Sequence, residues 1–154
     1  MGRVTASIDV PGPIAAAERL WYDTARWPAF VDGLHHVSRT DEGWPRERGA
    51  RVVWDAKPGG RGRVVEEVEA YEARVSQTTA QEDEMMRGTQ VVQFSARDDG
   101  MVRVEIDLDY AIKEAHAFTP LIDALFVRRT VRQALQRTLS RFARELRSDR
   151  EALT

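Results

Sequence analysis

Glu66 is the side chain in this sequence whose surroundings most strongly indicate chemistry. It lies between Val64 and Val68 at alternate positions of an expected strand, so its carboxyl group is directed toward the same apolar face. A carboxyl group in an apolar cavity has a raised pKa and is suited to general acid–base catalysis or to orienting a ligand hydroxyl group. The alternative is structural: Glu66 pairs with an arginine, or a bulge returns it to water.

Arg128 and Arg132 are the next candidates. Helical phase places both within the apolar stripe of the C-terminal segment, from which each could pair with Glu66 or with an anionic ligand group. In the alternative, the helix begins late or kinks near Phe126, and both arginines extend to the rim of the cavity.

The histidines offer a third possibility for acid–base chemistry. His35 and His36 are adjacent, so in a strand they face opposite sides, and one could line the cavity mouth. His116 precedes the last helix and could help to gate the entrance, although each histidine also has a purely structural reading. Two neighbouring histidines without a third ligand make a poor metal site, so we predict no metal and no cofactor.

A long amphipathic helix is expected to form one wall of the cavity, from Phe118 to Arg147. The segment has no glycine, and its only proline, Pro120, can occupy the first helical position after a Thr119 cap. At ~1.5 Å per residue this helix would be roughly 40 Å long and would need a broad apolar surface to pack against. Its apolar stripe is formed by Leu121, Leu125, Val131, Leu135, Leu139, Phe142 and Leu146.

The preceding chain supplies the strands of such a surface. In 102–112, apolar side chains alternate without exception. Further strands are expected at 4–10, 36–41, 49–57, 63–72, 73–81 and 86–97, with a helix at 14–25 and a short helical turn at 29–34. Short turns between strands indicate an antiparallel sheet with helices on one side, an α+β fold in a single domain, 1–154.

Strand alternation selects the side chains expected to face the helix. Trp54 and Tyr110 could stack on a flat ligand, although filling the core is the alternative for every aromatic residue. Val75, Thr79 and Gln81 are expected on the same face. The predicted ligand-binding residues are Trp54, Glu66, Gln77, Gln90, Phe94, Tyr110, Phe126, Arg128 and Arg132, and the candidates for catalysis are Glu66 and His35.

Composition narrows the classes of protein. The 154 residues are 42% apolar and 31% charged, which is typical of a soluble globular domain. The absence of cysteine excludes disulfides and thiolate chemistry. A net charge of −2 does not indicate nucleic-acid binding. Since neither a long apolar run nor a signal-peptide core is present, we expect a cytoplasmic protein without a membrane span, with homodimer formation left open.

Three stretches, in this order, resemble the START-like (SRPBCC) superfamily, and within it the bacterial polyketide cyclase/dehydrase-like proteins. The first runs from Val4 to Phe30 and contains Asp23, Trp27, Pro28 and Phe30 in a D-x-x-x-W-P-x-F/W pattern. The second is Val64–Val68, similar to the family's V-x-E-x-V strand. The third runs from Asp109-Tyr110 to Leu146 and corresponds to the last strand and closing helix.

The resemblance implies a helix-grip fold, in which a curved seven-stranded antiparallel sheet wraps around the C-terminal helix and encloses a hydrophobic cavity. Members of the superfamily bind lipids, sterols, polyketides or hormones, and a minority catalyse aromatic cyclisation. Because the superfamily shares no single catalytic residue, the resemblance assigns no catalytic role here.

Two functions follow from the sequence. The first is binding of a small hydrophobic or aromatic molecule, lipid or polyketide-like, between sheet and helix. The second is a polyketide cyclase or dehydratase that uses Glu66 with a histidine or arginine partner in the same cavity. A third reading is that side chains fill the cavity and the surface serves a protein partner.

Overall fold

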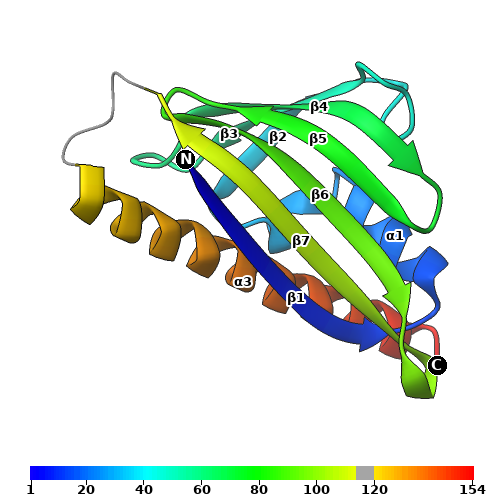
Figure 1. Ribbon diagram of the computed structural model, residues 1–154. Coiled ribbons are helices and arrows are strands. Elements are labelled where there is room, and N and C mark those ends of the chain that lie inside the picture. The colour runs from blue at the N-terminus through cyan, green and yellow to red at the C-terminus, as the bar shows by residue number, and fades with distance from the viewer. Residues whose placement is uncertain (114–119) are drawn as a thin grey trace.

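The computed structural model describes residues 1–113 and 120–154, with only the backbone described in 120–123. Its seven strands form one antiparallel sheet in the order β1-β7-β6-β5-β4-β3-β2 (Figure 1). Every strand from β2 to β7 therefore lies beside its neighbour in sequence. The strands are β1 (Gly2–Pro11), β2 (Leu34–Thr40), β3 (Arg51–Ala56), β4 (Arg63–Glu72), β5 (Ser76–Glu82), β6 (Met86–Ala96) and β7 (Met101–Ile112).

In the described part of the chain, three α-helices accompany the sheet, and the predicted α+β helix-grip arrangement is confirmed. Figure 1 shows the sheet curving around α3 (Pro120–Ala152), which runs along its concave side. The short helices α1 (Ile14–Tyr22) and α2 (Trp27–Phe30) follow β1. The second begins two residues earlier than the predicted turn at 29–34, because Pro28 lies in its first turn, where a proline is tolerated.

The alternation predicted for the last strand is present in β7. Val102, Val104, Ile106, Leu108 and Tyr110 are all buried, whereas the residues between them are partly or fully exposed. The same pattern in β4 buries Glu66 between Val64 and Val68. One apolar face of the sheet therefore points at α3, and the polar side chains on that face are enclosed with it.

The connection between β4 and β5 differs from the prediction of two nearly continuous strands. A tight turn at 73–75 separates them, and Arg74 adopts a left-handed backbone conformation with φ of 62°. Its backbone N–H donates to the carboxylate of Glu18 on α1. Val75 lies in this turn and is 43% exposed, so its predicted place on the inner face is wrong.

The two halves of α3 differ in packing. In its C-terminal half Phe142 is fully buried, with its ring centroid 5.3 Å from that of Trp21 and 5.4 Å from that of Phe30. In its first half Leu125 and Phe126 are 65% and 69% exposed. The helix is described from Pro120, while the predicted first residue, Phe118, and the Thr119 cap lie outside the described residues. The helix extends beyond Arg147 to Ala152.

Candidate functional site

A cavity of ≈ 350 Å³ lies between the inner face of the sheet and α3. Much of its wall is aromatic, with Trp21, Trp27, Phe30, Trp44 and Trp54 contributed by α1, α2, β3 and the loop before β3. One face of α3 forms the opposite wall, because its lining residues recur at helical spacing. These residues are Phe126, Val127, Thr130, Val131, Ala134, Leu135 and Thr138.

The mouth of the cavity lies between the β5–β6 turn and the first half of α3. Met85 from this turn and Phe126 from α3 both line the cavity and are also 45% and 69% exposed. A lining residue with that much exposure must stand where the cavity meets the solvent. The two side chains therefore mark the opening, together with the exposed lining residues Gly59 and Gly60 of the β3–β4 turn.

Glu66 forms the polar end of the cavity and is only 6% exposed. The indole Nε1–H of Trp54 donates to its Oε2 at 2.7 Å, and the amide Nε2–H of Gln81 donates to its Oε1 at 3.1 Å. Gln81 reaches it directly because β4 and β5 pair these two residues. Burial raises the pKa of the Glu66 carboxyl group, opposed by the bond from Trp54, the charge of Arg61 and the bond from Gln81.

An ion pair closes the cavity beside Glu66. Arg61, in the β3–β4 turn, donates from Nε to Oδ2 of Asp83 at 2.6 Å, and its guanidinium carbon lies 5.7 Å from the centre of the Trp54 ring. The side chain of Asp83 is fully buried, and its Oδ1 also accepts the backbone N–H groups of Met85 and Met86. The pair thus joins two turns at the same end of the sheet.

A family model described as "Polyketide cyclase / dehydrase and lipid transport" matches residues 1–147. The chain belongs to this family. Comparison with curated proteins found no match. The family model covers nearly the whole chain, including every strand and most of α3.

Solved structures similar to this polyketide cyclase/dehydrase family member share its fold at low sequence identity. A Streptomyces aromatase/cyclase, Zhui, has a TM-score of 0.78 and 13% identity, with 95% of this chain and 93% of that chain covered. A Thermus thermophilus protein has a TM-score of 0.74 and 17% identity, with 96% of this chain and 99% of that chain covered. A START superfamily protein from Mycobacterium smegmatis has a TM-score of 0.65 and 15% identity, with 99% of each chain covered. These likenesses establish the START-like fold.

Five of the residues predicted to bind a ligand line the cavity of this family member: Trp54, Glu66, Gln77, Gln90 and Phe126. Gln77 is partly committed to structure, because its Nε2–H donates to the carbonyl oxygen of Pro45 at 3.0 Å. The alternation of β3, β4, β5 and β6 explains why the four sheet residues meet at one surface.

Phe94 and Tyr110 are buried on the predicted face but are not among the described residues that line the cavity. Phe94 packs against Tyr22, with ring centroids 6.1 Å apart, and Tyr110 packs with Val4 and Leu108. Both side chains fill the core beside the cavity, which is the alternative that the sequence left open for aromatic residues.

The inward placement of Arg128 and Arg132 is wrong. Both side chains are exposed, and neither is among the cavity-lining residues. The helix turns Val127, Val131 and Leu135 toward the cavity, and a residue one position further along is rotated by about 100°. The predicted apolar stripe included Leu125, which is exposed. Including it shifted the predicted inner face of the helix so that it contained Arg128 and Arg132.

His35 also lies away from the cavity. Both His35 and His36 are exposed on β2, where a register shift between Leu34 and His36 disturbs the alternation. His36 Nε2 lies 3.3 Å from a carboxylate oxygen of Asp55. His116 lies outside the described residues. Within 1–113 and 120–154, no group of three acidic or histidine side chains is placed to hold a metal ion.

Arg61 and Asp83 were not among the residues predicted to form the site. Arg61 lies in the glycine-rich stretch 59–62 and Asp83 in the acidic run 82–84, and the composition of each indicates only a turn between strands. The order of the strands contained a usable signal. In an antiparallel meander alternate turns lie at the same end of the sheet, so the β3–β4 and β5–β6 turns are neighbours.

Proposed function

We propose that this protein binds a small hydrophobic or aromatic molecule in the cavity between the sheet and α3. The observation that carries the proposal is the cavity itself, whose ≈ 350 Å³ falls within the ~300–1,000 Å³ typical of small-molecule sites. Its wall combines tryptophan rings and aliphatic side chains with a few convergent polar groups, as ligand pockets do. The family description, which names lipid transport and polyketide chemistry, supports the same class of ligand.

A cavity-filling variant tests this proposal. Ala134 lies on the cavity side of α3, and its replacement by tryptophan would occupy ligand space. We expect Ala134→Trp to weaken binding of Nile red, an uncharged fluorescent dye, at least tenfold without changing the far-ultraviolet circular dichroism. Gln133→Trp is the matched control, because it places the same ring one residue away at an exposed position of the same helix.

Equal dye binding by the wild type and both variants would show that the dye does not occupy the cavity and would contradict the proposal. Native mass spectrometry of the purified protein provides an independent measurement. A small molecule that co-purifies with the wild type and is lost from Ala134→Trp would identify the ligand directly.

The alternative function is catalysis, as a polyketide cyclase or dehydratase. It is favoured by the buried carboxyl group of Glu66, whose raised pKa suits proton transfer. The partner that the sequence suggested would then be an arginine, because the described lining residues include Arg61 and no histidine. Incubation with aromatic polyketides separates the functions: catalysis predicts a product that Glu66→Gln no longer forms, and binding predicts reversible association only.

The setting in which the cavity operates is part of the same proposal. We infer from composition a cytoplasmic protein that functions without nucleic acid, and size-exclusion chromatography with light scattering will decide between monomer and homodimer. Within the described part of the chain, no helix is both long and apolar enough to cross a membrane.

A further inference from the structure

The charged side chains that line the cavity differ in whether a hydrogen-bond partner of opposite charge neutralises them. Asp32, one of the described lining residues, accepts from Arg137 Nε at 3.0 Å and from Arg141 Nη1 at 3.1 Å. Burial alone would raise the pKa of Asp32, but these two arginines hold it below its ordinary value, so the carboxylate stays ionised and paired. Its charge is therefore already satisfied by protein groups.

Arg61 is the single cation among the described residues that line the cavity, and it too has a partner. Its Nε–H is bound to the fully buried carboxylate of Asp83 at 2.6 Å. The carboxylate of Asp83 already compensates the charge of this guanidinium group, so an anionic ligand would have to share Arg61 with a second anion. The described wall of the cavity thus offers an incoming anion no cation that is free of a carboxylate.

Among the described residues, the hydrogen-bond partners of Glu66 are both neutral. Trp54 and Gln81 each donate one hydrogen bond, to different oxygens of its carboxyl group. A carboxyl oxygen can accept more than one hydrogen bond, and a protonated carboxyl group also has an O–H to donate. Glu66 can therefore accept a hydrogen bond from a ligand hydroxyl group in either protonation state, and it can donate one when it is protonated.

We propose that Glu66 and its neighbours form a hydrogen-bonding subsite for an uncharged hydroxyl group, and that the cavity rejects carboxylates. The ligand is then a neutral hydrophobic alcohol or phenol rather than a fatty or aromatic acid. This inference rests on the proposed binding function. A carboxylate in the cavity would lose its water, meet among the described lining residues only a cation already paired with Asp83, and lie close to a second carboxyl group, each of which is unfavourable.

A matched set of naphthalene compounds tests the subsite by isothermal titration calorimetry at neutral pH. Methylnaphthalene, naphthalenemethanol, naphthoic acid and naphthylmethylamine, all substituted at the same ring position, share one apolar body. We expect the alcohol to bind at least fivefold more tightly than the hydrocarbon and at least tenfold more tightly than the acid. The amine, which must lose the hydration of its charge, should bind more weakly than the alcohol.

Two substitutions address the residues responsible. Glu66→Gln keeps the shape and hydrogen-bonding capacity of the side chain but removes its charge, so the preference for alcohol over acid should shrink at least threefold. Asp83→Asn can still accept the backbone N–H groups but releases Arg61, and it should raise affinity for naphthoic acid at least fivefold. A gain of affinity is not a result that misfolding can produce.

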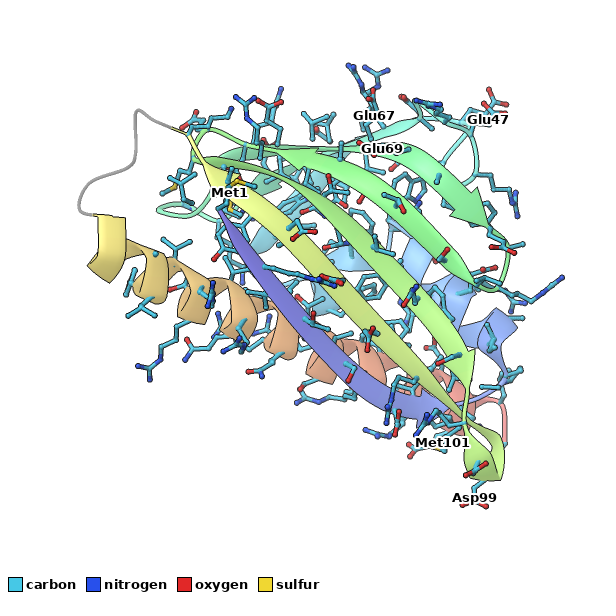
Figure 2. All side chains as sticks on the ribbon, in the orientation of Figure 1. Met1, Glu47, Glu67, Glu69, Asp99 and Met101 are labelled. Carbon is cyan, nitrogen blue, oxygen red and sulfur yellow. The ribbon has the colours of Figure 1, made fainter. Side chains whose placement is uncertain are left out.

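Glu69→Gln is the control, since Glu69 is exposed on the same strand and lies on the outer face of the sheet with Glu67 (Figure 2). It should leave all four affinities unchanged. Tighter binding of the acid or the amine than of the alcohol would overturn the subsite, as would equal binding of alcohol and hydrocarbon. Binding of none of the four compounds would instead contradict the proposed function, and the subsite with it.

Discussion

The buried carboxyl group of Glu66 is unusual because its hydrogen-bond partners carry no charge. The neutral donors Trp54 and Gln81 satisfy both oxygens, and the charge of Arg61, which lies over the Trp54 ring, acts without a hydrogen bond to Glu66. Removing the carboxyl group would leave the two donors unpaired, at a cost of ~1–3 kcal/mol for each group. Glutamine can replace glutamate here without that loss, because its amide offers an acceptor and Gln81 can rotate to present its own.

Stability should depend on pH through Glu66. Its pKa is raised from 4.5 in the folded protein, so the folded state holds the proton to higher pH than the unfolded chain does. Protonation of Glu66 therefore stabilises the folded state. This contribution is complete below pH 4.5 and is lost as pH rises through the raised pKa, and the free energy of unfolding falls by at most about 1.4 kcal/mol per pH unit. Glu66→Gln lacks this titration, so its free energy of unfolding relative to the wild type should increase with pH.

Urea denaturation of the wild type and of Glu66→Gln across a series of pH values measures this difference. The exposed Glu69→Gln serves as the control, and its difference from the wild type should show no comparable rise. A difference for Glu66→Gln that is the same at every pH would mean that the carboxyl group titrates alike in the folded and unfolded states.

At the scale of elements, α3 is held at one end. Arg26 binds Glu145 at 2.8 Å and Asp149 at 3.0 Å, and the backbone N–H of Asp32 donates to the hydroxyl group of Thr138 at 2.9 Å. These contacts, with the buried Phe142, fix the C-terminal half of the helix to α1, α2 and the loop that follows. The first half instead borders the cavity mouth, where the side chains of Leu125 and Phe126 are largely exposed.

Two phenylalanines on α3 should therefore differ sharply in their contributions to stability. Phe142→Ala removes a ring that is fully buried against Trp21 and Phe30, and should lower the free energy of unfolding by about 3–5 kcal/mol. Phe126→Ala removes a ring that is 69% exposed, and should change it by about 0.5 kcal/mol or less.

Urea denaturation of both variants makes the comparison, and the dye-binding assay extends it. Because Phe126 lines the cavity mouth, Phe126→Ala should weaken dye binding while leaving stability nearly unchanged. A large loss of stability in Phe126→Ala would show that the first half of α3 is packed more tightly than its exposure indicates.

The strands could be predicted because their side chains alternate, and this alone correctly placed Glu66, Trp54, Gln77 and Gln90. Alternation has a period of two residues, so a half-buried strand is easily recognised. The orientation of α3 was harder to predict, because the helix has more apolar residues than positions that face the sheet. Including Leu125 in the apolar stripe moved the predicted inner face away from Val127. The contact of Arg61 with Asp83 joins two turns that are distant in sequence, which no local pattern reports.

At the scale of the whole molecule, the cavity is a region where the core lacks protein atoms. A ligand that binds only the folded state raises the free energy of unfolding by RT ln(1 + [L]/Kd), which is about 2.7 kcal/mol when the ligand concentration is a hundred times Kd. We expect naphthalenemethanol to raise the thermal midpoint of the wild type and to have no such effect on Ala134→Trp. A midpoint shift of equal size in both proteins would place the binding site outside the cavity.

The order of elements was predictable on this scale, since short turns between strands leave few topologies open to a meander. The position of β1 was not predictable from its local sequence. It pairs with β7, with Gly2 opposite Tyr110 and Pro11 opposite Met101, and this pairing of strands from distant parts of the sequence was not predicted.

That pairing has a consequence for how the protein is made. β1 precedes the other strands of the sheet in the sequence, yet its partner strand is synthesised only after the other five. During that interval the apolar side chains of Val4, Ala6 and Val10 have no strand beside them, and a nascent chain in this condition is a substrate for chaperones and a hazard for aggregation. Contacts so distant in sequence also slow folding, so completion of the sheet is expected to follow the release of most of the chain.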